Sequence, residues 1–200
     1  MNYRDTVYRM VYDVLIEEKK ADKVLYRVPN EKDRDIIKRC SFGTIERAIT
    51  LEEVLKKYSE IPVKKIDDEV RILLLMALFE MTYMDSIPDY AAINETVSLY
   101  ERIAVSSGTY GRGKNTGKIN AGKNYINAVL RSAAGDIEAG IDIYEGFSDE
   151  KIYAMPNELW RHLEGTYGKK TAKKIAGAFL EKEGETTLHI DTSLISTEKY

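Results

Sequence analysis

Residues 67–83 read DDEVRILLLMALFEMTY, and almost every side chain from Val70 to Met81 is apolar. A helix on a protein surface keeps one polar face, and this stretch has none. It is also shorter than the about 20 apolar residues that cross a bilayer. A helix of this kind has to be enclosed by other helices. We therefore expect residues 67–83 to form the central helix of an all-helical bundle.

The segments around this stretch repeat apolar residues at helical spacing. A first helix is indicated by an i, i+3, i+4, i+7, i+8 stripe, which consists of Val7, Met10, Val11, Val14 and Leu15. A second helix should begin near Asp33 and continue to Ile45. Further helices are expected over 50–58, 90–103 and 124–134.

Two of these helices carry capping signals at their starts. Residues 50–53, T-L-E-E, have the form of a capping box, in which Thr50 accepts from free backbone amides and Glu53 reaches back. Asp89 follows a turn and is expected to cap the next helix. The sequence thus predicts helix starts at Thr50 and just after Asp89.

The pattern changes after Ala134, where Gly135 and Gly140 interrupt the helical period. We expect a helical domain over 1–134, a linker over 135–148 and an incomplete α+β domain over 149–200. This last part should contain two short amphipathic helices and one strand over 186–190. A lone strand leaves its backbone groups unpaired, so it pairs with another molecule or the chain is the front part of a longer protein.

Charge is distributed unevenly along the chain. The formal net charge is −3, but residues 1–131 carry 22 Lys and Arg against 20 Asp and Glu, and residues 132–200 carry 8 against 13. The segment 104–123 holds four cations and no acidic residue. This basic segment is the first candidate for binding an anionic partner.

Composition excludes several classes of site. The single cysteine, Cys40, rules out an intrachain disulfide and a cysteine zinc cluster, and two histidines are too few for a histidine metal site without several carboxylates. Cys40 lies at an apolar helical position and is expected to be buried. The charged first ten residues are not a secretory signal, so we predict a cytoplasmic protein without a membrane partner.

The basic segment matches the phosphate-loop pattern G-x-x-x-x-G-K twice, over 108–114 and 117–123. Each match is followed by asparagine instead of the Ser or Thr that binds magnesium, and the preceding segment is helical instead of a strand. Nucleotide hydrolysis is therefore disfavoured. Two readings stay open: a phosphate-binding segment rich in glycine and lysine, and a solvated insertion without a ligand.

The chain holds 14 tyrosines but only 4 phenylalanines, which indicates many half-exposed rings with a polar edge. Most of them should bridge the core and the solvent. Four lie in or beside basic segments and are candidates for stacking on unpaired bases: Tyr8, Tyr12, Tyr110 and Tyr125.

Two motifs then point to a known family. Residues 87–97, IPDYAAINETV, resemble the IP-x-x-A-A-I-N-E-x-V signature of the NusB-like domain, and residues 125–131, YINAVLR, are similar to its F-V-N-A-V-L-R helix. Both follow the apolar helix in the expected order. The resemblance implies an all-α, NusB-like helical bundle that binds RNA.

Further segments resemble one branch of this family, the bacterial ribosomal RNA cytosine-C5 methyltransferases of the Sun/Nop type. Residues 41–47, SFGTIER, resemble the Y-G-T-L-R-R segment of these enzymes. MPNELW over 155–160, YG over 167–168 and TLHID over 187–191 are similar to their P-x-W-L, Y-G and T-L-R-V-N run, with His189 and Asp191 in place of Arg and Asn.

This resemblance implies the RNA-binding N-terminal region of an S-adenosylmethionine-dependent small-subunit rRNA methyltransferase. In this interpretation residues 1–134 are the NusB-like RNA-binding domain, and residues 149–200 are the incomplete start of the substrate-positioning domain. S-adenosylmethionine is expected for the full-length enzyme; we expect no cofactor, metal or catalytic residue in this chain. Ribosomal RNA is the expected partner, and the sequence does not fix the oligomeric state. The candidate RNA contacts are Arg4, Arg9, Arg112, Lys114, Lys118, Lys123, Asn127 and Arg131. The alternative is a NusB-type antitermination factor, an RNA and protein interaction module whose second partner is a ribosomal protein.

Overall fold

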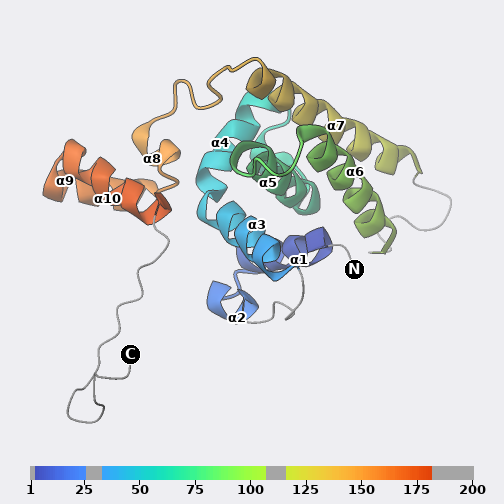
Figure 1. The fold of residues 1–200 in the computed structure, drawn as a ribbon, viewed down its shortest axis with the longest axis horizontal. Coiled ribbons are helices and arrows are strands. Elements are labelled where there is room, and N and C mark those ends of the chain that lie inside the picture. Colours follow the sequence, from blue (N-terminus) through green and yellow to red (C-terminus); the bar gives the residue numbers. More distant parts are fainter. Residues whose placement is uncertain (1–2, 26–32, 107–115, 182–200) are drawn as a thin grey trace, which may run out of the picture.

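The computed structural model describes residues 3–25, 33–106 and 116–181 (Figure 1). Every regular element in these ranges is helical, which confirms the predicted all-helical class. The expected strand over 186–190 lies outside the described residues. The elements are α1 (Tyr3–Leu15), α2 (Ala21–Leu25), α3 (Arg34–Glu46), α4 (Ala48–Tyr58), the 3₁₀ helix η1 (Val63–Lys65), α5 (Asp68–Tyr83), α6 (Asp89–Ser106), α7 (Thr116–Glu138), α8 (Asp149–Ile152), α9 (Asn157–Tyr167) and α10 (Lys169–Glu181).

Helix α5 occupies the centre of the bundle, as its sequence predicts. Every residue from Ile72 to Met81 is buried. Helices α1, α3, α4, α6 and α7 all pack against α5, and Figure 1 shows α5 in the middle of the bundle. In addition, α1 packs on α3, and α6 packs on α7. Because α5 is apolar on all sides, the other helices have to surround it, and this determines their arrangement in the bundle.

One charged side chain interrupts the buried stretch of α5. Glu80 is only 2% exposed and faces Arg4 of α1, which is 6% exposed. The Arg4 guanidinium donates from Nε to both carboxylate oxygens, at 3.0 and 3.2 Å, and from Nη2 to Oε2 at 2.8 Å. Tyr3 Oη donates to Oε1 at 3.3 Å. Burial raises the pKa of the Glu80 carboxyl, while the hydrogen bonds and the charge of Arg4 oppose that rise. This buried pair fixes the start of α1 on α5.

Replacement of Arg4 by Met should lower the free energy of unfolding by about 3–5 kcal/mol, because it leaves a buried carboxylate unpaired. Without its partner, Glu80 binds a proton more tightly in the folded state than in the unfolded state. The loss should therefore shrink as the pH falls towards 4.5, the ordinary pKa of a glutamate. Urea unfolding at several pH values measures both effects.

The double variant Arg4→Met/Glu80→Met is the control for this experiment. It removes both charges and should recover most of the lost stability, because an apolar pair of similar volume can replace a buried ion pair. A single variant as stable as the wild type at pH 7 would contradict the structural role of the pair.

Both predicted capping signals are wrong in detail. Helix α4 begins at Ala48 with Arg47 at its N-cap, so Thr50 lies inside the helix. Thr50 is buried, and its Oγ1 donates to the carbonyl oxygen of Lys151 at 2.5 Å. Asp89 is the first residue of α6. For α4 the reason is tertiary: α4 follows α3 almost directly, and the Thr50 hydroxyl holds α8.

Helix α7 is longer than the expected 124–134 at both ends. It starts at Thr116, so much of the basic segment is helical, and it continues through Gly135 to Glu138. Asp136 Oδ2 accepts a hydrogen bond from Tyr58 Oη of α4 at 2.9 Å. Ile143 is buried in the core of the bundle. Part of the segment expected as a linker therefore packs on the bundle, whereas the domain boundaries themselves stay a prediction.

Helices α9 and α10 form a hairpin with a small apolar cluster of its own, and they match the two predicted amphipathic helices. The cluster contains Met155, Trp160, Ala172 and Ala176, and the Tyr153 ring stacks on Trp160 with centroids 6.1 Å apart. Helix α8 joins the hairpin to α4. Figure 1 shows the hairpin beyond α4, on the side away from α6 and α7. Among the described helices, none is long and apolar enough to cross a membrane.

Gly43 on α3 lies against the ring of Phe79 on α5, where an added Cβ would collide with ring carbon Cζ. Gly43→Ala should therefore lower the free energy of unfolding by about 1–3 kcal/mol. The matched control is Gly135→Ala in α7, where a Cβ meets nothing within 4 Å. That change should raise stability by about 0.5–1 kcal/mol. Denaturant unfolding measures both, and a neutral Gly43→Ala would refute the close approach of α3 and α5.

Candidate nucleic-acid interface

The structure scatters the predicted RNA contacts over α1 and α7. Arg9 is exposed on α1, and Lys118 and Arg131 are exposed on α7. Lys123 and Asn127 lie between them on α7, partly buried. Arg112 and Lys114 lie outside the described residues.

Arg4 has to be reassigned. Its guanidinium is buried and bound to Glu80, so it belongs to the core and not to an RNA-binding surface. The sequence could not indicate this, because the partner is 76 positions away. We therefore leave Arg4 out of the interface proposed below.

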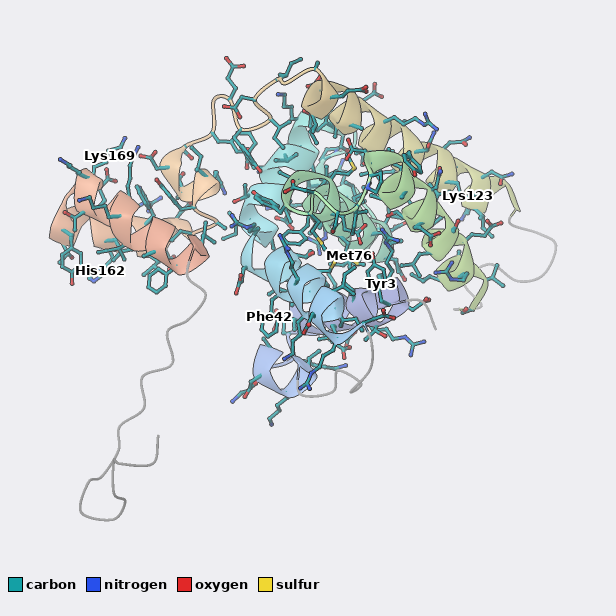
Figure 2. The ribbon with its side chains drawn as sticks, viewed as in Figure 1. Tyr3, Phe42, Met76, Lys123, His162 and Lys169 are labelled. Carbon is teal, nitrogen blue, oxygen red and sulfur yellow. The ribbon has the colours of Figure 1, made fainter. Side chains whose placement is uncertain are left out.

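Close packing of α7 on α6 positions those cations of the basic segment that lie in α7. Gly122 lies against Tyr100 of α6, and an added Cβ would collide with the tyrosine hydroxyl. The next residue, Lys123, reaches across to α6 and pairs with Glu101, with 2.9 Å between Nζ and Oε2. Figure 2 shows Lys123 at this outer edge of the bundle. The positive charge of Lys123 is thus partly compensated.

Lys118 lies on the rim of a pocket of about 360 Å³ between η1, the start of α5, α6 and α7. Lys65 of η1 contributes a second ammonium group, and Asp67 is the one acidic residue among the described residues that line it. The other lining residues are Ile61, Ile66, Val70, Tyr100, Ala121, Gly122 and Tyr125. A largely apolar floor with cations at the rim suits a flat, uncharged ring that carries a phosphate.

Tyr125 connects this pocket to the sequence prediction, since it was a candidate for base stacking. Its hydroxyl shares a hydrogen bond of 2.6 Å with Ser59 Oγ at the end of α4. This bond holds the tyrosine hydroxyl at a fixed place in the pocket wall. Of the four candidate tyrosines, Tyr125 is therefore the one that the structure combines with Lys118. Tyr8 and Tyr12 contact each other on α1, with centroids 5.7 Å apart and ring planes tilted by 43°, and Tyr110 lies outside the described residues.

Lys65 was missed by the sequence reasoning. The available signal was the pair Lys64-Lys65, which lies between the helices predicted over 50–58 and 67–83. Nothing in the local pattern shows that η1 and α7 line one pocket, because this arrangement depends on how the chain passes from α4 to α5. A dibasic pair in a connector is a useful cue when a basic helix is expected elsewhere.

The remaining candidates lie outside this pocket. Arg131 Nε donates to Asn127 Oδ1 at 2.9 Å, one turn apart on α7. Arg9 is on α1, which contributes none of the described residues that line the pocket. The structure therefore brings Lys118 together with Lys65 and Tyr125, and it leaves Arg9, Asn127 and Arg131 as separate surface positions.

Neither a metal centre nor a reactive thiol emerges from the described part of the chain. Within 3–25, 33–106 and 116–181, no group of three or more His, Cys, Asp or Glu side chains is placed to hold a metal ion. Cys40 is buried, with its Sγ 3.2 Å from Met84 Sδ. Burial, followed by the charge of Glu80, raises the pKa of this thiol to about 12.

Comparison with known proteins places the fold in a family. Residues 1–111, more than half of the chain, match the NusB family. The chain belongs to the NusB family. This confirms the resemblance drawn from the motif at 87–97, whereas the motif at 125–131 lies beyond the matched residues.

Relatives of this NusB-family chain fall into two groups. It is 26% identical over 164 residues to the probable ribosomal RNA small subunit methyltransferase B of Synechocystis sp., an alignment that covers 79% of this chain and 33% of that protein. The corresponding protein of Bacillus subtilis is 27% identical over 154 residues, which cover 73% and 30%. The transcription antitermination protein NusB of Bacillus velezensis is 26% identical over 119 residues, which cover 59% and 81%. The chain spans about a third of the length of the two methyltransferases.

Cys40 should react with a thiol reagent at pH 8 only when the chain unfolds, because its thiolate is disfavoured and its sulfur is buried. Native protein should therefore be labelled at least about 100-fold more slowly than protein in guanidinium chloride. Absorbance of the released thiol dye gives both rates. Equal rates would show that α3 exposes Cys40 to the solvent.

Proposed function

We propose that this chain is the RNA-binding N-terminal region of a small-subunit rRNA cytosine-C5 methyltransferase. One observation favours this branch over the antitermination factors. The alignment with the Synechocystis methyltransferase covers 79% of the chain, which is about 158 residues. Even an alignment that starts at residue 1 must then extend past the start of α8 at Asp149. It therefore includes part of the α8–α10 segment, whereas the alignment with the Bacillus velezensis NusB covers 59%.

In this proposal the chain binds and orients ribosomal RNA for a catalytic domain outside the chain. Lys65 and Lys118 contact phosphates at the pocket rim, and Arg112, Lys114 and Lys123 extend this contact along the basic segment. The pocket beside Tyr125 accepts an unpaired base. S-adenosylmethionine would supply the methyl group in the full-length enzyme, and we assign no residue of this chain to it.

The second candidate function is an antitermination factor that binds RNA together with a ribosomal protein. It is supported by the coverage of the NusB relatives, since the alignment spans 81% of the Bacillus velezensis protein. The two candidates differ in what α8–α10 does. For an antitermination factor, residues 149–200 should be dispensable and RNA affinity should require the partner protein.

The test is a titration of a fluorescent rRNA hairpin at 50 and 200 mM salt. The variant replaces Arg112, Lys114, Lys118 and Lys123 with glutamine. Log affinity falls as log salt rises, and each lost phosphate contact on single-stranded RNA should make this slope less steep by about 0.7. Loss of all four contacts should therefore make it less steep by roughly 3 and weaken binding strongly at low salt.

A matched control replaces four other lysines of the same charge, namely Lys19, Lys20, Lys23 and Lys38. These lie after α1, in α2 and in α3, and their loss should leave the slope nearly unchanged. Equal affinities and equal slopes for the wild type and the basic-segment variant would remove this segment from the RNA site.

A further inference from the structure

A second cluster of cations lies at the start of α10, in the part of the sequence with net negative charge. Residues 169–174 read KKTAKK, so six positions hold half of the eight Lys and Arg that occur over 132–200. Helix α10 has one carboxylate, Glu181, at its last position. The overall charge of this region therefore conceals a locally basic surface.

Helix stability does not account for this arrangement. The positive end of a helix dipole lies at its N-terminus, so cations in the first turns and an anion in the last turn are both unfavourable there. One acidic side chain compensates part of the charge: Asp149 of α8 binds Lys169 at 3.1 Å and Lys173 at 2.7 Å. A hydrogen bond from Lys173 lowers the pKa of Asp149, so this carboxylate stays charged.

Lys170 and Lys174 have no carboxylate partner among the described residues. Both are exposed, and at i, i+4 spacing they project one turn apart from the same side of α10. The buried residues Ala172 and Ala176 lie on the opposite side of the helix. Two uncompensated ammonium groups therefore point to the solvent together.

The position of α10 is fixed by contacts with the bundle. Thr50 Oγ1 donates to the Lys151 carbonyl, which holds α8 on α4. At the other end of α10, Arg47 Nη2 donates to the Leu180 carbonyl at 3.4 Å, and the same guanidinium lies 4.3 Å from the centre of the Tyr83 ring. Figure 2 shows Lys169 and Lys123 on opposite sides of the protein. These contacts hold α10, and with it the lysines at its start, on the same bundle that carries α7.

We propose that the exposed lysine face of α10, formed by Lys170 and Lys174, is a second RNA-binding surface that contacts phosphates of the RNA held at the α7 pocket. This inference rests on the proposed function. RNA is favoured over an acidic protein because the other basic region of the chain is proposed to bind the same polyanion. An RNA that contacts both must be long enough to pass along the bundle and α8.

The experiment compares two RNA probes with the full chain and the variant Lys170→Glu/Lys174→Glu. The probes are an rRNA fragment of about 40 nucleotides and a single strand of about 8 nucleotides, which can occupy the pocket alone. The variant should bind the long probe roughly tenfold more weakly, and its salt slope should fall by about 1.4, because two phosphate contacts are lost. Affinity for the short probe should stay the same.

The matched control is Lys20→Glu/Lys23→Glu, which makes the same change in charge at two other exposed lysines. Affinity for the long probe equal to that of this control would overturn the inference, and so would an equal loss for both probes. If the wild type binds neither probe, the proposed function fails instead. Circular dichroism checks folding, and Lys170→Gln/Lys174→Gln, expected to lose about half of the effect, replaces the glutamate variant should that one not fold.

Discussion

Helix α5 imposes the constraint on which the structure depends, because it carries apolar side chains in every direction. Its neighbours α1, α3, α4, α6 and α7 each cover part of its surface. Cover of this kind also restricts where polar groups can go. The buried carboxylate of Glu80 is tolerated because Arg4 brings a guanidinium into the core with it. The candidate interface residues lie on helices around α5, on surfaces that are not enclosed by other helices.

Close helix contacts then set the shape of the candidate site. Glycine at positions 43 and 122 lets α3 approach Phe79 and lets α7 approach Tyr100. The second contact brings α7 beside α6 and leaves a pocket between them and η1. The cations themselves are ordinary surface lysines. What makes them a candidate site is that Lys65 and Lys118 line the same pocket as several apolar residues and a tyrosine held by Ser59.

Much of the fold could be predicted because periodicity is local. The all-round apolar pattern at 72–81 identified the central helix, and the amphipathic patterns after 155 identified α9 and α10. Errors arose where tertiary contacts override local signals. Thr50 looks like a cap but donates to α8, and Gly135 looks like a breaker but lies inside α7. For the same reason Arg4 was wrongly predicted as an RNA contact and Lys65 was missed, because burial and pocket formation depend on residues distant in sequence.

Arg47 has a consequence for how the chain would engage a long partner. It follows the last residue of α3, occupies the N-cap position of α4, lies over Tyr83 and donates to the last turn of α10. When a flexible tether joins two binding surfaces, the effective concentration for the second binding event depends on the length of the tether. In the proposed binding by two surfaces, helix packing sets their separation, so an RNA that matches this span would gain the full benefit of two contacts. An RNA too short to reach both surfaces would gain none of it, and helix packing would thus select for RNA length.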